Sequence, residues 1–317
     1  MKKFIARKLA YMVLIFLGIS ILIFILGHLA PGDPAELALS RDGAFQPTEE
    51  QIEATREKLG LSGPLYVQYF SWLKKIIRLD FGTSYSTSRQ VGEIFAEKLP
   101  YTLKLSIFSI IIIVLFGLIF GILAAVSYNS LLDYFIQGLQ NIFLSLPQFW
   151  IGIFLILVFN ERLKILPSSG VGSFKHYILP SLTLSLIGLS NISRLTRAAF
   201  LNELGKAYYN YGIARSISKK RIVFTHVFPN AFLSVLPLIG NYVAGLIGGS
   251  SIVETIFAIP GIGAFAVNSI LLKDIPVLQA YVLFTSAVFL ISYTLVDLIS
   301  ISLNPRLKGE LTNERNL

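Results

Sequence analysis

The sequence has 317 residues, of which 54% are hydrophobic and 14% charged, and its mean hydropathy is +0.68, which indicates a membrane protein rather than a soluble domain. Its net charge of +9 is explained by cations at the ends of membrane helices, so we expect no nucleic-acid partner. The absence of cysteine excludes disulfides, thiolate metal sites and thiol nucleophiles.

The first predicted element is an apolar run over 9–30, which follows the basic segment MKKFIARK. It is longer than the core of a signal peptide, and no small-x-small cleavage site follows it. We therefore expect an uncleaved first membrane helix.

The segment 31–98 is predicted to be a small, soluble, helical insert. Thr48 and Gln51 form a capping-box pattern before EEQIEATREKL, and Gly60 follows the end of that helix. In the next helix, PLYVQYFSWLKKIIRL, four residues fall on one stripe: Leu65, Tyr69, Leu73 and Ile76. This stripe predicts packing on the membrane domain.

Five further segments are long and apolar enough to cross a membrane. They cover 103–126, 134–159, 178–200, 231–253 and 280–303. Amides and prolines interrupt 134–159 and 178–200, and such groups are costly in lipid, so we expect these two inside a bundle or beside a cavity. The predicted class is an all-α membrane protein with six transmembrane helices.

Lysine and arginine in short loops set the orientation of membrane helices. They concentrate before the first span, around 202–231 and after the last span, which places both termini in the cytoplasm and 31–98 outside. We therefore divide the chain into a tail with the first helix (1–30), an extracytoplasmic insert (31–98), a core transmembrane domain (99–303) and a cytoplasmic tail (304–317).

The sequence lacks the motifs that several kinds of chemistry require. No G-x-x-x-x-G-K-[ST] phosphate loop occurs, so we expect no ATP hydrolysis and no cofactor bound by this chain. The histidines at 28, 176 and 226 are scattered, which disfavours a metal site. Charges within the spans are few, chiefly Lys104 and Asp297, whereas coupled carriers usually need several.

Two spans carry a polar stripe. In 134–159 the spacing of four, four and three predicts one helical face for Gln137, Asn141, Ser145 and Gln148. In 231–253 the same rule joins Asn241, Gly245 and Gly248. Amides and small residues either hold membrane helices together or line a path for a polar solute, and the spacing leaves both open.

The most distinctive segment is the basic, aromatic insert NELGKAYYNYGIARSISKKRIVFTHVFPNA over 202–231. We expect two short helices. In the first, Tyr208, Tyr211 and Arg215 share a face, as in a helix laid in a partner's groove. The second starts after Ser218 and ends at Pro229. Its cations suit anionic lipid equally well, so the spacing does not choose between protein and lipid.

At this point the sequence resembles the permease subunits of binding-protein-dependent ABC importers, in the dipeptide, oligopeptide and nickel permease family, first-subunit type. Besides the insert, four motifs occur in order: the N-terminus through Pro31-Gly32-Asp33-Pro34, then Leu79–Ser106, Val253–Leu283 and Val296–Lys308. Together they cover nearly the whole chain.

The resemblance implies a type I ABC importer permease fold in the inner membrane of a bacterium or archaeon. It implies a homologous second permease, two cytoplasmic ATPase subunits that use ATP and Mg, and an external solute-binding protein. The helix near 207–217 would be the coupling helix that sits in an ATPase groove, so that ATP binding turns the pathway outward. The substrate stays open among dipeptides, longer peptides, nickel chelates, glutathione and sugars.

The residues expected to form the coupling loop are Glu203, Gly205, Lys206, Ala207, Tyr208, Tyr211, Ala214, Arg215, Ser216, Asn230 and Ala231. Three positions depart from the family pattern: Ala207 replaces an acid, Ser216 a glycine and Ile217 a leucine. Glycine permits a positive φ that serine adopts only at a cost, so the turn is either built differently or couples less typically.

Two alternative functions remain. A stand-alone channel or secondary carrier would act without a second permease or ATPases. A membrane scaffold would leave the polar stripes unexplained.

Overall fold

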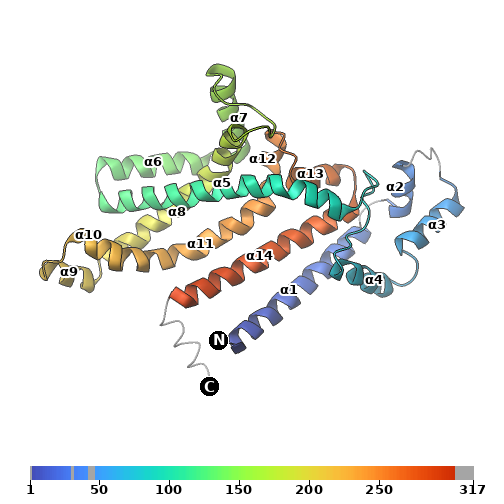
Figure 1. The fold of residues 1–317 in the computed structure, drawn as a ribbon, viewed down its shortest axis with the longest axis horizontal. Coiled ribbons are helices and arrows are strands. Elements are labelled where there is room, and N and C mark those ends of the chain that lie inside the picture. The colour runs from blue at the N-terminus through green and yellow to red at the C-terminus, as the bar shows by residue number, and fades with distance from the viewer. Residues whose placement is uncertain (1, 30–31, 42–46, 304–317) are drawn as a thin grey trace. The chain divides into compact units, whose positions relative to one another are not determined.

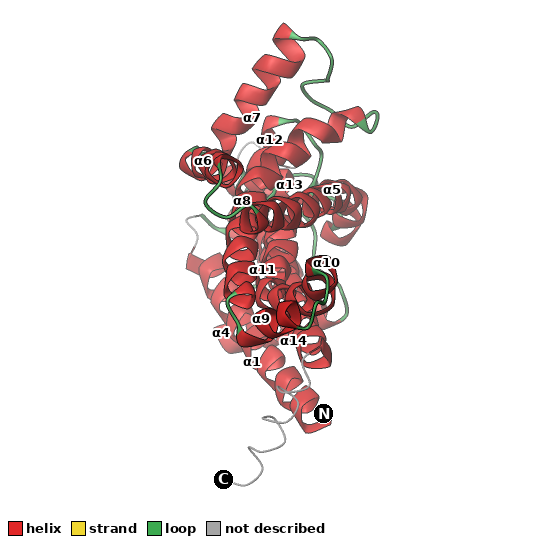
Figure 2. Cartoon of the chain, turned by 90° about the vertical axis from the view of Figure 1, so that its left-hand side faces the viewer, coloured by secondary structure: helices red, strands yellow, loops and turns green. Residues whose placement is uncertain are grey.

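The computed structural model describes residues 2–29, 32–41 and 47–303. Every regular element in these ranges is a helix, and their single β-type pairing is an isolated bridge between Thr83 and Gln90 (Figure 2). The predicted all-α class is confirmed. Pro31 and the predicted cytoplasmic tail 304–317 lie outside the described residues.

Five helices in the described part are long and apolar enough to cross a membrane, and a bent pair makes a sixth span if its two helices are taken together (Figure 1). The long helices are α1 (Lys2–Leu29), α5 (Val91–Val126), α8 (Lys175–Leu204), α11 (Phe228–Gly249) with the turns before it, and α14 (Ile275–Leu303). The bent pair is α6 (Leu131–Ser145) with α7 (Gln148–Ile156) and the π-turn η1 (Leu157–Arg162). Six spans were predicted, and the described part has five such helices, or six spans when the bent pair is taken as one.

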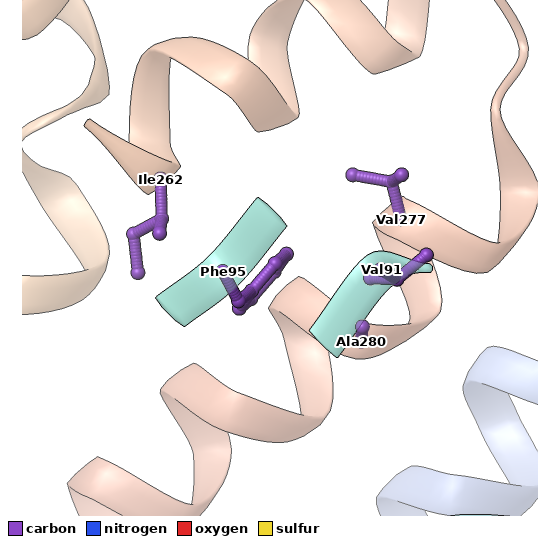
Figure 3. Packing of buried hydrophobic residues seen from close by; sticks show 5 residues of the cluster. All are labelled: Val91, Phe95, Ile262, Val277 and Ala280. Carbon is purple, nitrogen blue, oxygen red and sulfur yellow. The ribbon is translucent and has the colours of Figure 1, made fainter. Parts of the chain in front are cut away.

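The chain divides into two compact units. The first consists of Met1–Thr102 and Pro260–Val288. Besides α1 it contains α2 (Pro34–Arg41), α3 (Glu49–Leu59), α4 (Leu65–Ile77) and α13 (Ile262–Leu271). A buried cluster of apolar side chains holds the start of α5, α13 and the start of α14 together (Figure 3): Val91, Phe95, Ile262, Val277 and Ala280.

Local sequence signals fix the ends of α3 as predicted. The Thr48 hydroxyl accepts from the Gln51 amide, and the Gln51 side chain accepts from the Thr48 amide at 3.0 Å, which completes the capping box. At the other end Gly60 adopts a left-handed conformation with φ of 74° and closes the helix.

The second unit consists of Leu103–Ile259 and Phe289–Leu317. It also contains α9 (Ala207–Ala214), α10 (Lys219–Ile222), the π-turn η2 (Val223–Val227) and α12 (Ser251–Ile256). Helix α8 lies at its centre, with α6, α7 and α11 packed against it. The expectation that 178–200 lies inside a bundle is confirmed, because most of α8 is buried.

Glycines allow α5 to approach α8 closely. Gly117 and Gly121 form a small-xxx-small pair, and a Cβ on Gly121 would stand 2.5 Å from the Cβ of Thr196. At Gly117 the Cβ would stand 2.7 Å from Ile192. Such pairs let membrane helices pack backbone to backbone.

The prediction of one continuous helix over 134–159 is wrong. Helices α6 and α7 meet at a bend of 103°. Leu146 is extended, with φ of −95° and ψ of 135°, because the ring of Pro147 disfavours a helical conformation at the residue before it. Pro147 is the N-cap residue of α7, which begins at Gln148.

The prediction that the second helix of the insert ends at Pro229 is also wrong. The chain continues as one span from Lys219 to Gly249 through η2. In this π-turn the amide of Phe228 bonds to the carbonyl of Val223, so the register changes where proline has no N–H to donate. The Asn230 side chain donates to the carbonyl of His226 at 2.9 Å.

Candidate functional site

The insert 202–231 forms a compact platform on the second unit. Its buried residues share one apolar cluster with the ends of α5 and α8: Ala125, Phe200, Ile222, Val227 and Ala231. Helix α9 lies directly on α10, since a Cβ on Gly212 would stand 2.8 Å from Ile222. A glycine is required there by this close approach. The platform is therefore supported by side chains from several helices.

A polar contact fixes the start of α9. The buried carboxylate of Glu203 accepts from Lys206 Nζ at 2.5 Å and from the Tyr208 hydroxyl at 2.9 Å. Burial, together with this neighbouring carboxylate, raises the pKa of Tyr208 to about 12. Tyr208 thus faces the body of the unit, and its predicted place beside Tyr211 and Arg215 on one outer face is wrong.

The outer face of α9 is built around Tyr211 and Arg215. The Tyr211 side chain is 62% exposed, and the Arg215 guanidinium lies 4.8 Å from its ring centroid. This cation–π contact holds the two exposed side chains together. The small residues Ala207 and Ala214 are also exposed on α9. Tyr211 and Arg215 therefore form a short exposed ridge with small residues beside it, a shape that fits a groove in a partner.

The turn after α9 keeps a left-handed residue without glycine. Ser216 has φ of 59°. The amide of Ile217 bonds to the carbonyl of Gly212 at 3.1 Å, and the amide of Ser216 bonds to that of Ile213 at 2.9 Å. These two bonds define a Schellman motif. Serine therefore adopts the geometry that glycine would favour.

The remaining predicted loop residues frame this platform. Gly205 ends α8, with its amide bonded to Leu201 at 3.1 Å, and Lys206 is the extended residue before Ala207. Ser218 precedes α10 as predicted. Asn230 and Ala231 lie in the first turn of α11, where Ala231 is buried.

The polar stripe of 134–159 is interrupted by the bend. Gln137, Asn141 and Ser145 lie on α6, but Gln148 starts α7, so the prediction of a single face is wrong for Gln148. Its Nε2 instead reaches the carbonyl of Thr183 at 3.5 Å. Asn141 and Ser145 are exposed.

The stripe on α11 also faces outward. Asn241 is exposed and accepts from the Tyr293 hydroxyl at 3.3 Å. Gly245 has open space where a side chain would be. Helices α6 and α11 each pack on α8, so the two stripes flank the central helix.

The sequence did not reveal the ion pair of Asp133 and Arg197. Asp133 is fully buried on α6, and it also accepts from the Asn129 amide and the Gln137 side chain. Asp133 stands three residues after the N-cap serine, Ser130, a pattern that predicts the start of a helix and does not point to Arg197.

A second buried carboxylate anchors the loop before α5. Asp274 accepts from the hydroxyls of Ser84 and Ser86 at 2.7 and 2.6 Å. It also accepts from the amides of Tyr85 and Ser86 at 3.0 and 2.9 Å. Burial raises the pKa of Tyr85 to about 12, and the charge of Asp274 adds to this effect. Within the described ranges, no group of three or more His, Asp or Glu side chains could hold a metal ion.

Two family models match this chain, one after the other along the sequence. Residues 117–309 match the family model "Binding-protein-dependent transport system inner membrane component". Residues 1–106 match the model of the N-terminal part of binding-protein-dependent transport system membrane components.

Two relatives illustrate the similarity. The glutathione transport system permease protein GsiC of Shigella flexneri serotype 5b is 35% identical over 308 residues, covering 97% of this chain and 99% of that protein. A putative peptide transport system permease protein of Brucella abortus (strain 2308) is 34% identical over 316 residues, covering 97% and 99%.

One solved structure has a similar fold. It is an inward-facing form of the MetNI methionine ABC transporter, with a TM-score of 0.53 and 17% identity. The match covers 67% of this chain and 96% of the other.

Proposed function

The chain belongs to the family of binding-protein-dependent transport system inner membrane components, and from this membership we propose how it works and what it carries. It is the permease subunit of an ABC importer, a multi-pass inner-membrane protein that functions with ATPase and binding-protein partners, and it is not the ATPase subunit. A stand-alone carrier is not favoured.

For the substrate we propose a short peptide or a peptide-like solute such as glutathione. The support is the similarity to glutathione and peptide permeases over nearly the whole chain. Uncharged amides on α6 and α11 suit such solutes, because they can bond to either end of a zwitterion without trapping it electrostatically.

For the pathway we propose that a second, homologous permease completes it. Asn141, Ser145, Asn241 and Gly245 lie on outward faces of this unit, so a path lined by them needs a facing subunit. In this arrangement both termini are cytoplasmic, and the cell is a bacterium or an archaeon.

For energy coupling we propose that α9 docks in a groove of an ATPase subunit. The observation that carries this proposal is the exposed Tyr211–Arg215 ridge on a platform held by a buried cluster. The ATPase subunits bind ATP and Mg, and this chain binds neither. Closure of the ATPase pair moves the platform, and its rigid packing passes the movement to α8 and α11.

Disulfide crosslinking tests the docking. The chain has no cysteine, so Tyr211→Cys or Arg215→Cys can be paired with single cysteines along the groove of a cysteine-free ATPase. We expect crosslinks from both positions in membranes. Phe224→Cys, which is 71% exposed on η2, is the matched control on the same insert and should crosslink poorly. No crosslink from α9 at several groove positions would contradict the docking, and transport without ATPase subunits would contradict the whole function.

A further inference from the structure

Helix α4, in the predicted soluble insert, has one face that packs against the first unit. Its half-buried and buried residues recur at helical spacing: Gln68, Tyr69, Trp72, Leu73 and Ile76. Three of the four residues of the predicted packing stripe lie on this face. Leu65, the fourth, is 60% exposed, so its predicted burial is wrong.

A second face of α4 is apolar yet exposed. Tyr66, Phe70 and Ile77 are spaced four and seven residues apart, which places them on one stripe, and their exposed fractions are 66%, 64% and 74%. Three large side chains on one stripe are costly in water. The remaining face carries Ser71, Lys74, Lys75 and the C-cap residue Arg78, with Val67, 47% exposed, as its one large apolar side chain. This three-sided pattern is typical of helices that lie in a membrane interface.

Contacts with α1 give the depth of α4. The Tyr69 hydroxyl lies 2.8 Å from Ser20 Oγ. Ser20 stands nine residues before Leu29, the end of the apolar span, so at 1.5 Å per residue it lies roughly 13 Å inside that end. Phe24 contacts the rings of Tyr69 and Trp72, with centroids 5.4 and 5.6 Å apart.

The contacts continue toward the end of the span. His28 Nε2 lies 2.9 Å from Gln68 Oε1. Helix α4 therefore runs beside the last turns of the apolar part of α1, as Figure 1 also shows, and not beyond its end. At this level α1 exposes its own apolar side chains, including Ile25 at 49% and Leu26 at 51%.

We infer that α4 is an interfacial helix seated in the lipid leaflet at the C-terminal end of α1. Tyr66, Phe70 and Ile77 enter the acyl region, while Lys74 and Arg78 reach the headgroups. The occupant of the exposed stripe is lipid because the stripe is continuous in depth with the lipid-facing surface of α1. In the orientation proposed above, this is the outer leaflet. The insert is thus partly embedded in the membrane.

Depth-dependent fluorescence quenching tests this inference in the assembled importer. Phe70→Cys carries an environment-sensitive NBD label in vesicles of phosphatidylcholine and phosphatidylglycerol. We expect nitroxide lipids labelled near the top of the acyl chain to quench it at least twofold more strongly than iodide does. Ser71→Cys, one residue away on the polar face, is the matched control and should show the reverse preference. Ile77→Cys repeats the test should the first variant assemble poorly.

Two outcomes would overturn the inference. Equal iodide quenching at Phe70→Cys and Ser71→Cys would place both in water. Protection of Phe70→Cys that appears only after the external binding protein is added would assign the stripe to protein docking. Neither result depends on α9 or on transport, so a failure here leaves the proposed function standing.

Discussion

The guanidinium of Arg197 donates from Nε and Nη2 to the two carboxylate oxygens of Asp133, at 2.8 and 2.7 Å. The pair joins α6 to α8 across 64 residues of sequence. Asp133 has no exposed surface and the Arg197 side chain is 20% exposed. Tyr128 lies beneath the guanidinium, 5.4 Å from it. A planar, two-bond contact of this kind fixes the distance and the angle between the two helices.

Removal of the arginine should therefore destabilise the unit. Arg197→Ala leaves a buried carboxylate without its counter-charge, and we expect a loss of about 3–5 kcal/mol. Thermal unfolding in detergent measures it. Arg194→Ala, an exposed arginine three residues earlier on the same helix, is the control and should change stability by less than about 0.5 kcal/mol. Equal effects of the two variants would mean that the pair does not hold α6.

Alanine substitutions at Gly121 and Gly138 should change the stability of the chain in opposite directions. Gly121→Ala places a Cβ 2.5 Å from that of Thr196, and overpacking of this kind costs about 1–3 kcal/mol. Gly138→Ala meets nothing within 4 Å and should stabilise α6 by up to about 1 kcal/mol, since alanine favours helix. Unfolding of both variants as isolated chains makes the comparison. A neutral Gly121→Ala would show that α5 and α8 are loosely packed.

The left-handed turn after α9 should accept the glycine that the family pattern leads us to expect. Ser216→Gly removes a conformational cost of roughly 1 kcal/mol and keeps both backbone bonds of the turn. We expect unchanged or slightly higher stability and full transport. Ser216→Val, with a branched Cβ at positive φ, should lose both in part. Complete loss of transport in Ser216→Gly would mean that the side chain of serine is required for coupling.

The Tyr208–Glu203 contact predicts a pH dependence. The pKa of Tyr208 is about 12 in the folded chain and 10.0 in its ordinary state, so folding favours the neutral phenol. This stabilisation is complete below about pH 10 and is lost as the pH rises toward 12. Absorbance at 295 nm, taken as the difference between the wild type and Tyr208→Phe, should titrate near 12. Glu203→Gln should lower that midpoint. A difference spectrum that titrates at 10 in the wild type would contradict the buried contact.

Asp274 should control the order of the loop before α5. Asp274→Asn presents an NH₂ group to hydroxyl and amide donors, so at least one of four hydrogen bonds is lost at a cost of about 1–3 kcal/mol. We expect faster hydrogen exchange and proteolysis over 82–90. Asp80→Asn, an exposed neighbour whose carboxylate accepts from the Gly82 amide at 3.0 Å, is the control. Unaltered exchange in Asp274→Asn would mean that the loop is held by other contacts.

Local and long-window signals in the sequence predicted much of this fold. Six spans follow from apolar length alone, because transfer into lipid is a sum over about 20 residues. The ends of α3 follow from Thr48, Gln51 and Gly60, which act on backbone groups next to them. The failures have equally specific causes. The segment 134–159 is apolar enough on average to read as one span, although a steric effect of Pro147 bends the chain at Leu146.

Tertiary partners explain what the helical spacing could not predict. The spacing of Tyr208, Tyr211 and Arg215 is correct for a helix, but it does not tell which side meets the protein. Glu203, across the turn at Gly205, draws Tyr208 inward. Predicting the Asp133–Arg197 pair requires knowing that α6 packs on α8. Neither relationship has a local signature in the chain.

The number of residues in the π-turn at Val223–Val227 sets which side of α11 faces outward. One residue of an α-helix turns it by about 100°, so the wider turn rotates everything after it relative to α10. Asn241 and Gly245 lie on the outward side of α11 because of the number of residues between the platform and these positions. Substitutions within η2 preserve that count. A one-residue deletion there would keep the composition, the span and the platform, yet turn a different side of α11 outward.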